Sequence, residues 1–261
     1  YSLILLRELV RTEFKLRYQG SVLGYLWSLL RPLFLFVILF VVFVYFLKVG
    51  HDIPHWPVAM LLGIVLWNFF SEVTNVGITS VVNRGDVIRK INFPKYVIVL
   101  ASSMSALINL AINLAVVAVF MIIDKVTFSW TILLVPLLVL ELFLLALGIA
   151  FLLSAIFIKL RDVNYIWEII MQGMFYGSIV IYPVSMVIDR SQAIAQTLLL
   201  NPVAQVIQDI RYALVDHQMP TLLSVSQNAS LYLIPVGIVI VLFVTGVYYF
   251  RKNSPYFAEN V

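Results

Sequence analysis

The stretch VVNRGDVIRKINFPK, residues 81–95, separates two long apolar runs and carries the basic residues Arg84, Arg89, Lys90 and Lys95. The runs on either side are long enough to cross a bilayer, because a hydrocarbon core about 30 Å thick needs roughly 20 apolar residues per helix. The charged stretch must therefore emerge at a membrane surface, where water, lipid headgroups or another protein can meet its charges. It predicts a chain of membrane helices with a charged connection between the second and the third.

The composition agrees with this prediction. The 261 residues are 62% hydrophobic and 11% charged, with a mean hydropathy of +1.03, whereas soluble domains are about 25% charged. Backbone groups in lipid must be hydrogen-bonded within their own segment, so the spans should be helices. We predict one all-α membrane domain over residues 1–261. Six segments qualify as spans: residues 32–47 (extended by a turn from 26–30), 57–82, 96–123, 131–158, 164–188 and 231–250.

The distribution of basic residues predicts the orientation. Of the 17 Lys and Arg residues, 13 fall on the side that holds both termini and the 81–95 stretch. The others are Lys48, Lys125, Arg190 and Arg211. Cytoplasmic loops carry the positive excess in membrane proteins, so both termini are predicted to be cytoplasmic. The net charge of +4 is explained by this bias, and we predict no nucleic-acid partner.

Several kinds of chemistry are missing from the sequence. There is no cysteine, so disulfides and thiolate metal sites are excluded. There is no phosphate-binding loop of the G-x-x-x-x-G-K-[ST] type, and His51, His55 and His217 fall in loops without metal-ligand spacing. We therefore predict no catalytic residue, no metal and no cofactor in this chain. If transport needs ATP, then ATP and Mg²⁺ must bind a separate subunit.

The N-terminal arm, residues 1–20, is amphipathic. Leu6 and Val10 fall on one helical face, while Arg7 and Arg11 fall on another. This pattern is typical of a helix that lies in the membrane interface. The arm can serve only as a membrane-surface anchor, or it can also rest on a cytoplasmic partner.

The connection after the fifth predicted span is longer than a helix hairpin requires. We predict two short re-entrant outer helices within residues 184–216, the second capped by Asn201 with Pro202 at its first position. Its apolar side holds Val203, Val206, Ile207, Ile210 and Leu214. Asp189, Arg190, Asp209 and Arg211 are expected to keep the other side wet. Long ordered connections are usually functional, which favours a gate over a spacer.

Polar residues recur inside the spans, where they are costly and face the bundle interior or a cavity. The second span has Asn68, Ser71, Glu72, Asn75 and Thr79, the third has Asn109 and Asn113, and the fifth has Glu168, Gln172 and Tyr176. Such stripes either bond neighbouring helices or line a path, and the Gly173 to Gly177 spacing suits close helix packing. In the first span Phe36, Phe40 and Phe43 share one face, which suits stacking on the sugars of a sliding chain.

Three stretches resemble a known family. LRYQGSVLGYLWSLLRPL (16–33), INFPKYVIVLASSMSALINLAIN (91–113) and KLRDVNYIWEIIMQGMFYGSIVIYP (159–183) look like the permease subunit of type-2 ABC exporters, specifically those that export polysaccharides such as bacterial O antigens and teichoic acids. The resemblance covers nearly the whole chain. Its most specific parts are the Leu23-Gly24, Trp27 and Pro32 spacing, the Phe93-Pro94 turn and the Arg161-Asp162 turn.

The resemblance implies a homodimeric pore in the bacterial cytoplasmic (inner) membrane, clamped by two ABC ATPase subunits. Residues 83–94 would then form a coupling helix seated in a cleft of the ATPase, with Pro94 ending it. The alternative is that the basic residues only enforce topology. The coupling residues implied are Arg84, Asp86, Val87, Ile88, Arg89, Lys90, Arg161 and Asp162.

The resemblance also implies the substrate, a polysaccharide linked to undecaprenyl diphosphate. Arg31 and Arg17 would receive the pyrophosphate through charge-assisted hydrogen bonds. The path would lie at the dimer interface between the first, second and fifth spans, and the particular polymer does not follow. The implied path residues are Phe36, Phe40, Phe43, Trp67, Phe70, Glu72, Gln172, Phe175, Tyr176 and Tyr182.

Two other classes of protein compete with this interpretation. A secondary transporter or channel would use Glu72, Glu141 and Glu168 as ion or proton sites, although the sequence shows no evident repeat pair of the kind many carriers have. A membrane scaffold would have no path at all. Co-purification with an ATPase would separate the exporter from both.

Overall fold

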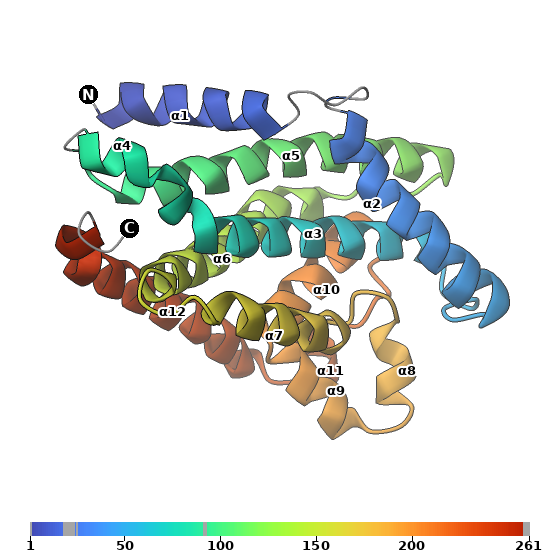
Figure 1. Ribbon diagram of the computed structural model, residues 1–261. Coiled ribbons are helices and arrows are strands. Elements are labelled where there is room, and N and C mark those ends of the chain that lie inside the picture. The colour runs from blue at the N-terminus through green and yellow to red at the C-terminus, as the bar shows by residue number, and fades with distance from the viewer. Residues whose placement is uncertain (1, 18–23, 25, 91–92, 258–261) are drawn as a thin grey trace.

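The computed structural model describes residues 2–17, 24, 26–90 and 93–257, and within these ranges it is helical with no strand (Figure 1). The long helices are α2 (Leu26–Leu39) continued by the π-helical η1 (Phe40–Phe46), α3 (Trp56–Ser80), α5 (Tyr96–Ile123), α6 (Val135–Phe157) preceded by η3 (Trp130–Leu134), and α12 (Leu233–Asn253). The shorter elements are α1 (Ser2–Arg17), η2 (Val82–Arg84), α4 (Gly85–Lys90), α7 (Val163–Gly177), α8 (Val184–Ile188), α9 (Gln192–Leu199), α10 (Pro202–Leu214), α11 (Leu222–Ser226), η4 (Ala229–Tyr232) and η5 (Ser254–Tyr256).

Five helical segments among the described residues are long and apolar enough to cross a membrane, so the chain is an integral membrane protein. The first includes the extra turn that the sequence predicts before residue 32. The segments are Leu26–Phe46, Trp56–Ser80, Tyr96–Ile123, Trp130–Phe157 and Ala229–Tyr256.

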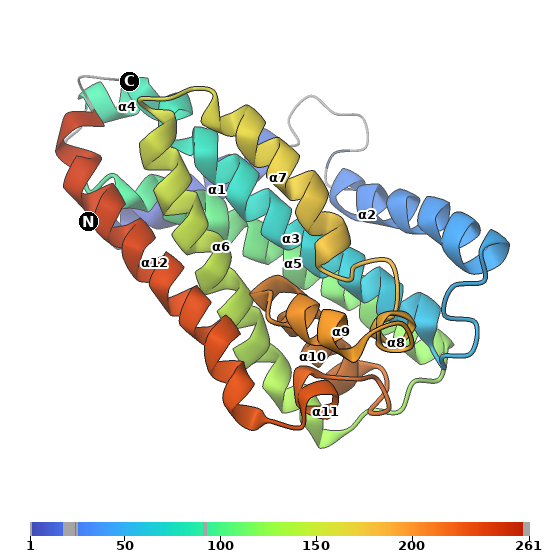
Figure 2. The ribbon, with the colours of Figure 1, turned by 90° about the horizontal axis from the view of Figure 1, so that it is seen from below.

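Helix α3 is the central element of the bundle. Most of its side chains are buried, and its polar residues Asn68, Ser71, Glu72 and Asn75 form one stripe along the helix. Helices α2, α5, α6, α7 and α10 all pack against it, as Figures 1 and 2 show. Its 25 residues extend about 37 Å, so one helix positions residues from one membrane face to the other.

Close packing between α6 and α12 depends on glycine. A Cβ atom on Gly246 would collide with the backbone carbonyl of Gly148, and a Cβ on Gly148 would collide with the backbone at Phe243. Small residues allow helix backbones to approach in membranes, where dispersion contacts drive association. In contrast, a Cβ on Gly173 or Gly177 of α7 would meet nothing within 4 Å. The predicted close packing at these two residues is therefore not made within the described protomer.

The predicted fifth span, residues 164–188, is wrong as a continuous helix. Helix α7 stops at Gly177 after 15 residues, which is about 22 Å and too short for a bilayer core of about 30 Å. Ile179 then adopts the left-handed conformation, with φ of 56°, and the chain resumes as α8 only after Pro183. The residue before a proline is disfavoured in a helix, so Pro183 indicates a helix end. The apolar side chains of residues 179–181 nevertheless continue the hydropathy of α7, and the break cannot be recognised from hydropathy.

The segment after the break folds back into the bundle. Asn201 Oδ1 accepts a hydrogen bond from the backbone N–H of Val203 at 3.0 Å, and Pro202 opens α10, so the predicted cap is confirmed. Helices α8, α9 and α11 gather around α10 near one end of the long helices (Figure 2). Two further short helices, α8 and α11, accompany the two that the sequence predicts.

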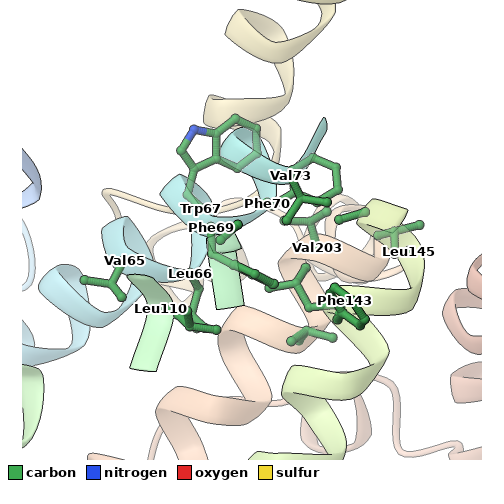
Figure 3. Close-up of a cluster of buried hydrophobic side chains, with 14 of the residues drawn as sticks. Val65, Leu66, Trp67, Phe69, Phe70, Val73, Leu110, Phe143, Leu145 and Val203 are labelled. Carbon is green, nitrogen blue, oxygen red and sulfur yellow. The ribbon is translucent and has the colours of Figure 1, made fainter. Parts of the chain in front are cut away.

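Helix α10 is buried on both sides. The sequence predicts a solvent-exposed side that includes Arg211, and for Arg211 this prediction is wrong. The apolar residues Val203, Val206, Ile207 and Ile210 have 0% exposed surface, as predicted for its apolar face, but Arg211 also has 0%. Helix α10 packs against α3, α6 and α12. Figure 3 shows Val203 beside Phe70 of α3 and Phe143 of α6 in one apolar cluster.

The N-terminal helix α1 packs along α5. Leu9 is buried with Val97 and Ala101 of α5, and Leu6 and Val10 pack against the same cluster. Arg7 and Arg11 are exposed. The amphipathic pattern therefore has the predicted apolar face, whereas a position in the membrane interface stays a prediction.

Candidate functional site

A polar cavity of about 440 Å³ lies between α2, α3 and α5. The polar stripes predicted on the second and third spans meet here, since both face the same space. Its lining residues are Trp27, Ser28, Arg31, Pro32, Val65, Asn68, Phe69, Ser71, Glu72, Asn75, Val76, Asn109, Leu110 and Asn113. Thr79 of the predicted stripe is not among them.

Hydrogen bonds organise the wall of the cavity. Asn109 Nδ2 of α5 donates to Glu72 Oε1 of α3 at 2.9 Å. Asn113 Nδ2 donates to the carbonyl oxygens of Asn109 at 2.8 Å and of Ser28 at 3.3 Å, so it connects α5 to α2. The two roles considered for the polar stripes are therefore combined, because the same amides bond helices together and line a cavity.

A cationic side chain, that of Arg31, also lines the cavity. Arg31 comes from α2, is exposed, and has no ion-pair partner among the described residues. A guanidinium in a membrane helix is strongly attracted to an anionic group, which it binds through paired hydrogen bonds. The neighbouring amides of Asn68 and Asn75 can donate and accept, and Trp27 adds an aromatic face. This combination suits a ligand that carries both an anion and hydroxyl groups. The side chain of Arg17, the second predicted pyrophosphate ligand, lies outside the described part of the structure.

The aromatic row of the first span packs inward. The rings of Phe36 and Phe40 are 5.8 Å apart, and Phe36 also meets Phe120 of α5 at 6.2 Å. Phe36 is buried, and Phe40 and Phe43 are half-buried. Within one protomer these rings contact the bundle, and an open corridor along them stays a prediction.

The other predicted path residues divide into two groups. Trp67 and Phe70 lie in the core (Figure 3), with Phe70 fully buried and Trp67 packed edge-on against Phe175 at 5.6 Å. Gln172 and Tyr176 instead lie on the exposed face of α7. Tyr182 joins the two regions, because its hydroxyl donates to the carbonyl of Tyr176 at 2.6 Å. The structure thus places these residues around α7 rather than in one enclosed channel.

The charged stretch forms two short helical turns, η2 and α4, which lie at the same end of the molecule as both termini and the turn between α6 and α7 (Figures 1 and 2). Lys95 Nζ donates to the carbonyl of Ser254 at 2.6 Å, and Lys159 Nζ donates to Asn253 Oδ1 at 3.1 Å. These bonds hold the ends of α5, α6 and α12 together. Lys95 and Lys159, two of the basic residues predicted to share one membrane side, therefore lie together at this end.

The predicted coupling residues occupy different environments at this end. Asp86, Arg161 and Asp162 are exposed, and the Arg161 guanidinium lies 5.0 Å from the centre of the Phe157 ring. Ile88, predicted as an apolar contact for a partner, is instead 5% exposed and packs in the core of this chain. Arg84 is half-buried, and the side chains of Val87, Arg89 and Lys90 lie outside the description.

Sequence reasoning missed the role of Arg211. Its Nε donates to the carbonyl of Ala59 at 2.9 Å, and its two terminal nitrogens donate to those of Ile179 at 2.8 Å and Val180 at 2.6 Å. Burial lowers the pKa of the guanidinium to about 9. Arg211 thereby satisfies backbone groups that the break after α7 exposes, which would otherwise be costly in a dry interior.

Two further features accommodate this guanidinium. It lies 5.1 Å from the centre of the Trp56 ring, a cation–π arrangement. Gly63 leaves the space it occupies, because a Cβ there would collide with the guanidinium. A lone Arg in an otherwise apolar helix face, opposite a glycine in the central span, was the available signal in the sequence.

The three acids considered for ion transport do not meet at one site. Glu72 lines the cavity, Glu168 is exposed on α7, and Glu141 faces α10. The arrangement is that of a polytopic helical membrane protein with a polar cavity among its spans.

The family is shown by sequence comparison. The model of the ABC-2 type transporter family matches residues 4–215, and the chain belongs to this family of membrane subunits. An O-antigen export system permease protein RfbA of Myxococcus xanthus is 28% identical over 98% of this chain and 95% of its own length. A protein of the same name from Klebsiella pneumoniae is 27% identical over 99% of this chain and 95% of its own length.

Proposed function

We propose that this chain is the permease subunit of an ATP-driven exporter that moves a lipid-linked O-antigen type of polysaccharide across the cytoplasmic membrane. The observation that carries the proposal is that relatives named as O-antigen export permeases align with it over nearly their whole length. Their names favour O antigen over teichoic acid as the cargo class. In this proposal two copies form the pore, and both termini are cytoplasmic.

ATP hydrolysis is assigned to two separate ATPase subunits that dock on the end of the molecule bearing α4. Two observations support this: Asp86, Arg161 and Asp162 are exposed, and Figure 2 shows α4 at the same end as the turn between α6 and α7. The buried side chain of Ile88 packs in the core and so anchors α4 to the bundle. A push on α4 would therefore be transmitted to α3 and α5, the two helices that flank it.

The cavity between α2, α3 and α5 is proposed to receive the polar end of the lipid-linked substrate, an undecaprenyl diphosphate. Arg31 would bind phosphate oxygens, and the amides around Glu72 would bind the hydroxyls of the first sugar. The path for the remaining sugars would run along α2, α3 and α7 at the dimer interface. The α8–α11 segment would form the exit gate on the other side.

The test is purification from cells that co-express the chain with the ATPase encoded beside it. We expect a stable complex whose ATP turnover rises with added lipid-linked glycan. Asp86→Lys should reduce that stimulation while leaving the permease folded, since Asp86 is exposed. Asp52→Lys, at an exposed position in the loop between η1 and α3, is the charge-matched control for ATPase association. A chain that purifies without any ATPase and still transports would refute the proposal.

A further inference from the structure

A second polar cluster lies inside the protein, away from both the cavity and the coupling end. It joins Glu141 of α6, Gln205 and Asp209 of α10, and Tyr232 of η4. Gln205 Nε2 donates to Asp209 Oδ2 at 2.7 Å, and the Tyr232 hydroxyl donates to Asp209 Oδ1 at 3.0 Å. The side chain of Gln205 also lies beside the Glu141 carboxyl. The cluster thus bridges α10 to a membrane span and to the start of α12.

Two oxygens of this cluster have no donor. Glu141 Oε1 and Gln205 Oε1 are both buried, and neither receives a hydrogen bond from the described residues. Gln205 itself is only 1% exposed. A buried acceptor left unsatisfied costs about 1–3 kcal/mol, and because the Gln205 side chain lies beside the Glu141 carboxyl, one added donor could satisfy both.

The chemistry of the amide indicates what would fill both oxygens. Gln205 Nε2 donates to Asp209, whereas Gln205 Oε1 can only accept a hydrogen bond. A proton on the Glu141 carboxyl would turn that group into a donor to Gln205 Oε1. A single proton would then give both unfilled oxygens a partner.

A metal ion does not fit the same place. Calcium takes six to eight oxygen ligands, whereas the described cluster offers two oxygens without donors. No group of three acidic or histidine side chains with metal-binding geometry occurs in the described ranges. Burial raises the pKa of the Asp209 carboxyl, which also favours a bound proton.

The other elements packed on α10 bring few charges to the cluster. Arg211 directs its guanidinium away, to the carbonyls of Ile179 and Val180. The one charged residue of α3, Glu72, is bonded in the cavity to Asn109. His217 meets Thr131 and Tyr212, and η3 and α9 contain no titratable residue.

We propose that Glu141, Gln205 and Asp209 form a proton-binding site that locks α10 against α6, with one proton shared between the two carboxyls. While the proton is bound, each carboxyl has a partner and α10 stays in place. When it leaves, two carboxylates compete for one amide and repel each other across the α6–α10 contact. Helix α10 and the break after α7 that Arg211 holds then loosen together. The site is a property of this fold and does not depend on the identity of the exported polymer.

The test measures hydrogen–deuterium exchange of the α10 amides in the full chain in lipid nanodiscs, across a series of pH values. Glu141→Gln is compared with the parent at each pH, so the pH dependence of the exchange chemistry cancels. The variant keeps a donor for Gln205 without a titratable proton. We expect equal exchange at acidic pH and at least tenfold faster exchange in the parent at alkaline pH. Glu168→Gln, exposed on α7, is the matched control and should follow the parent throughout.

A second measurement uses the parent protein alone. Infrared spectroscopy at neutral pH should show the carbonyl band of a buried protonated carboxyl, which Glu141→Gln should remove and Asp209→Asn should shift. Two results would overturn the proposal: no such band in the parent, or α10 exchange that is identical in the parent and Glu141→Gln at every pH. If Glu141→Gln does not fold, Asp209→Asn takes its place in both measurements.

Discussion

The cavity of α2, α3 and α5 and the region around α10 both bury polar groups among apolar helices, yet they do so in opposite ways. In the cavity the polar groups keep open space beside them, and the exposed Arg31 has room for a ligand. Around α10 the space is filled, and Arg211 is fully enclosed by carbonyl oxygens. The difference fits the ligand-binding role that we propose for the first region, whereas the contacts of the second hold a backbone break in place.

The largest effect should follow replacement of Arg211. Arg211→Met leaves the carbonyls of Ile179 and Val180 buried without donors, so we expect a loss of stability on the order of 3 kcal/mol. Thermal unfolding in detergent measures it. Arg190→Met, at an exposed position two residues after the end of α8, should unfold like the parent. Equal unfolding of both variants would contradict the role given to Arg211.

A smaller loss of stability is expected at the α6–α12 crossing. Gly246→Ala places a methyl group against the backbone at Gly148, and overpacking of this kind costs about 1–3 kcal/mol. Gly173→Ala, in open space on α7, should be neutral or stabilising by about 1 kcal/mol, because alanine is the better helix former. A reversed order in the two unfolding midpoints would show that α6 and α12 do not cross as described.

The proton site should make stability depend on pH. Burial raises the pKa of Asp209 in the folded state, so the folded chain holds a proton that an unfolded carboxyl releases above about pH 4. Stability is then greatest at acidic pH and falls as the pH rises through the folded value, by up to about 1.4 kcal/mol per pH unit. The difference between the parent and Glu141→Gln, measured across pH, isolates this contribution. If the difference in stability between the parent and Glu141→Gln does not change with pH, the proton site makes no such contribution.

The smallest effect on folding, and a large one on binding, is expected in the cavity. Arg31→Gln removes a cation that has no ion-pair partner among the described residues, so unfolding should change by less than about 0.5 kcal/mol. Affinity for undecaprenyl diphosphate should fall about tenfold or more, since hydrogen bonds to charged groups contribute about 1.5–3 kcal/mol. Arg190→Gln is the matched control for binding. An unchanged affinity in Arg31→Gln would place the headgroup elsewhere.

Much of this architecture follows from the sequence, because hydropathy and spacing report which residues face lipid. Five of the six spans, the extended start of the first, the cap at Asn201 and the polar stripes of Asn68, Glu72 and Asn109 were all accessible in this way. The fifth span was not, since the apolar residues 179–181 continue the hydropathy of α7 beyond its end. The prediction that Arg211 is exposed to solvent failed for a related reason. A charged residue is expected at a solvent-exposed position unless its hydrogen-bond acceptors are known, and here these are carbonyls distant in sequence.

The central claim, that this chain is the membrane subunit of an ATP-driven exporter, is tested most directly by transport in proteoliposomes. The permease and its ATPase are reconstituted together, and a lipid-linked glycan is supplied on the ATPase side. We predict that glycan reaches the opposite side only with hydrolysable ATP, and that Arg31→Gln slows this transfer without lowering the amount of assembled complex. Transfer at the parent rate without the ATPase, driven by an ion gradient, would contradict the account.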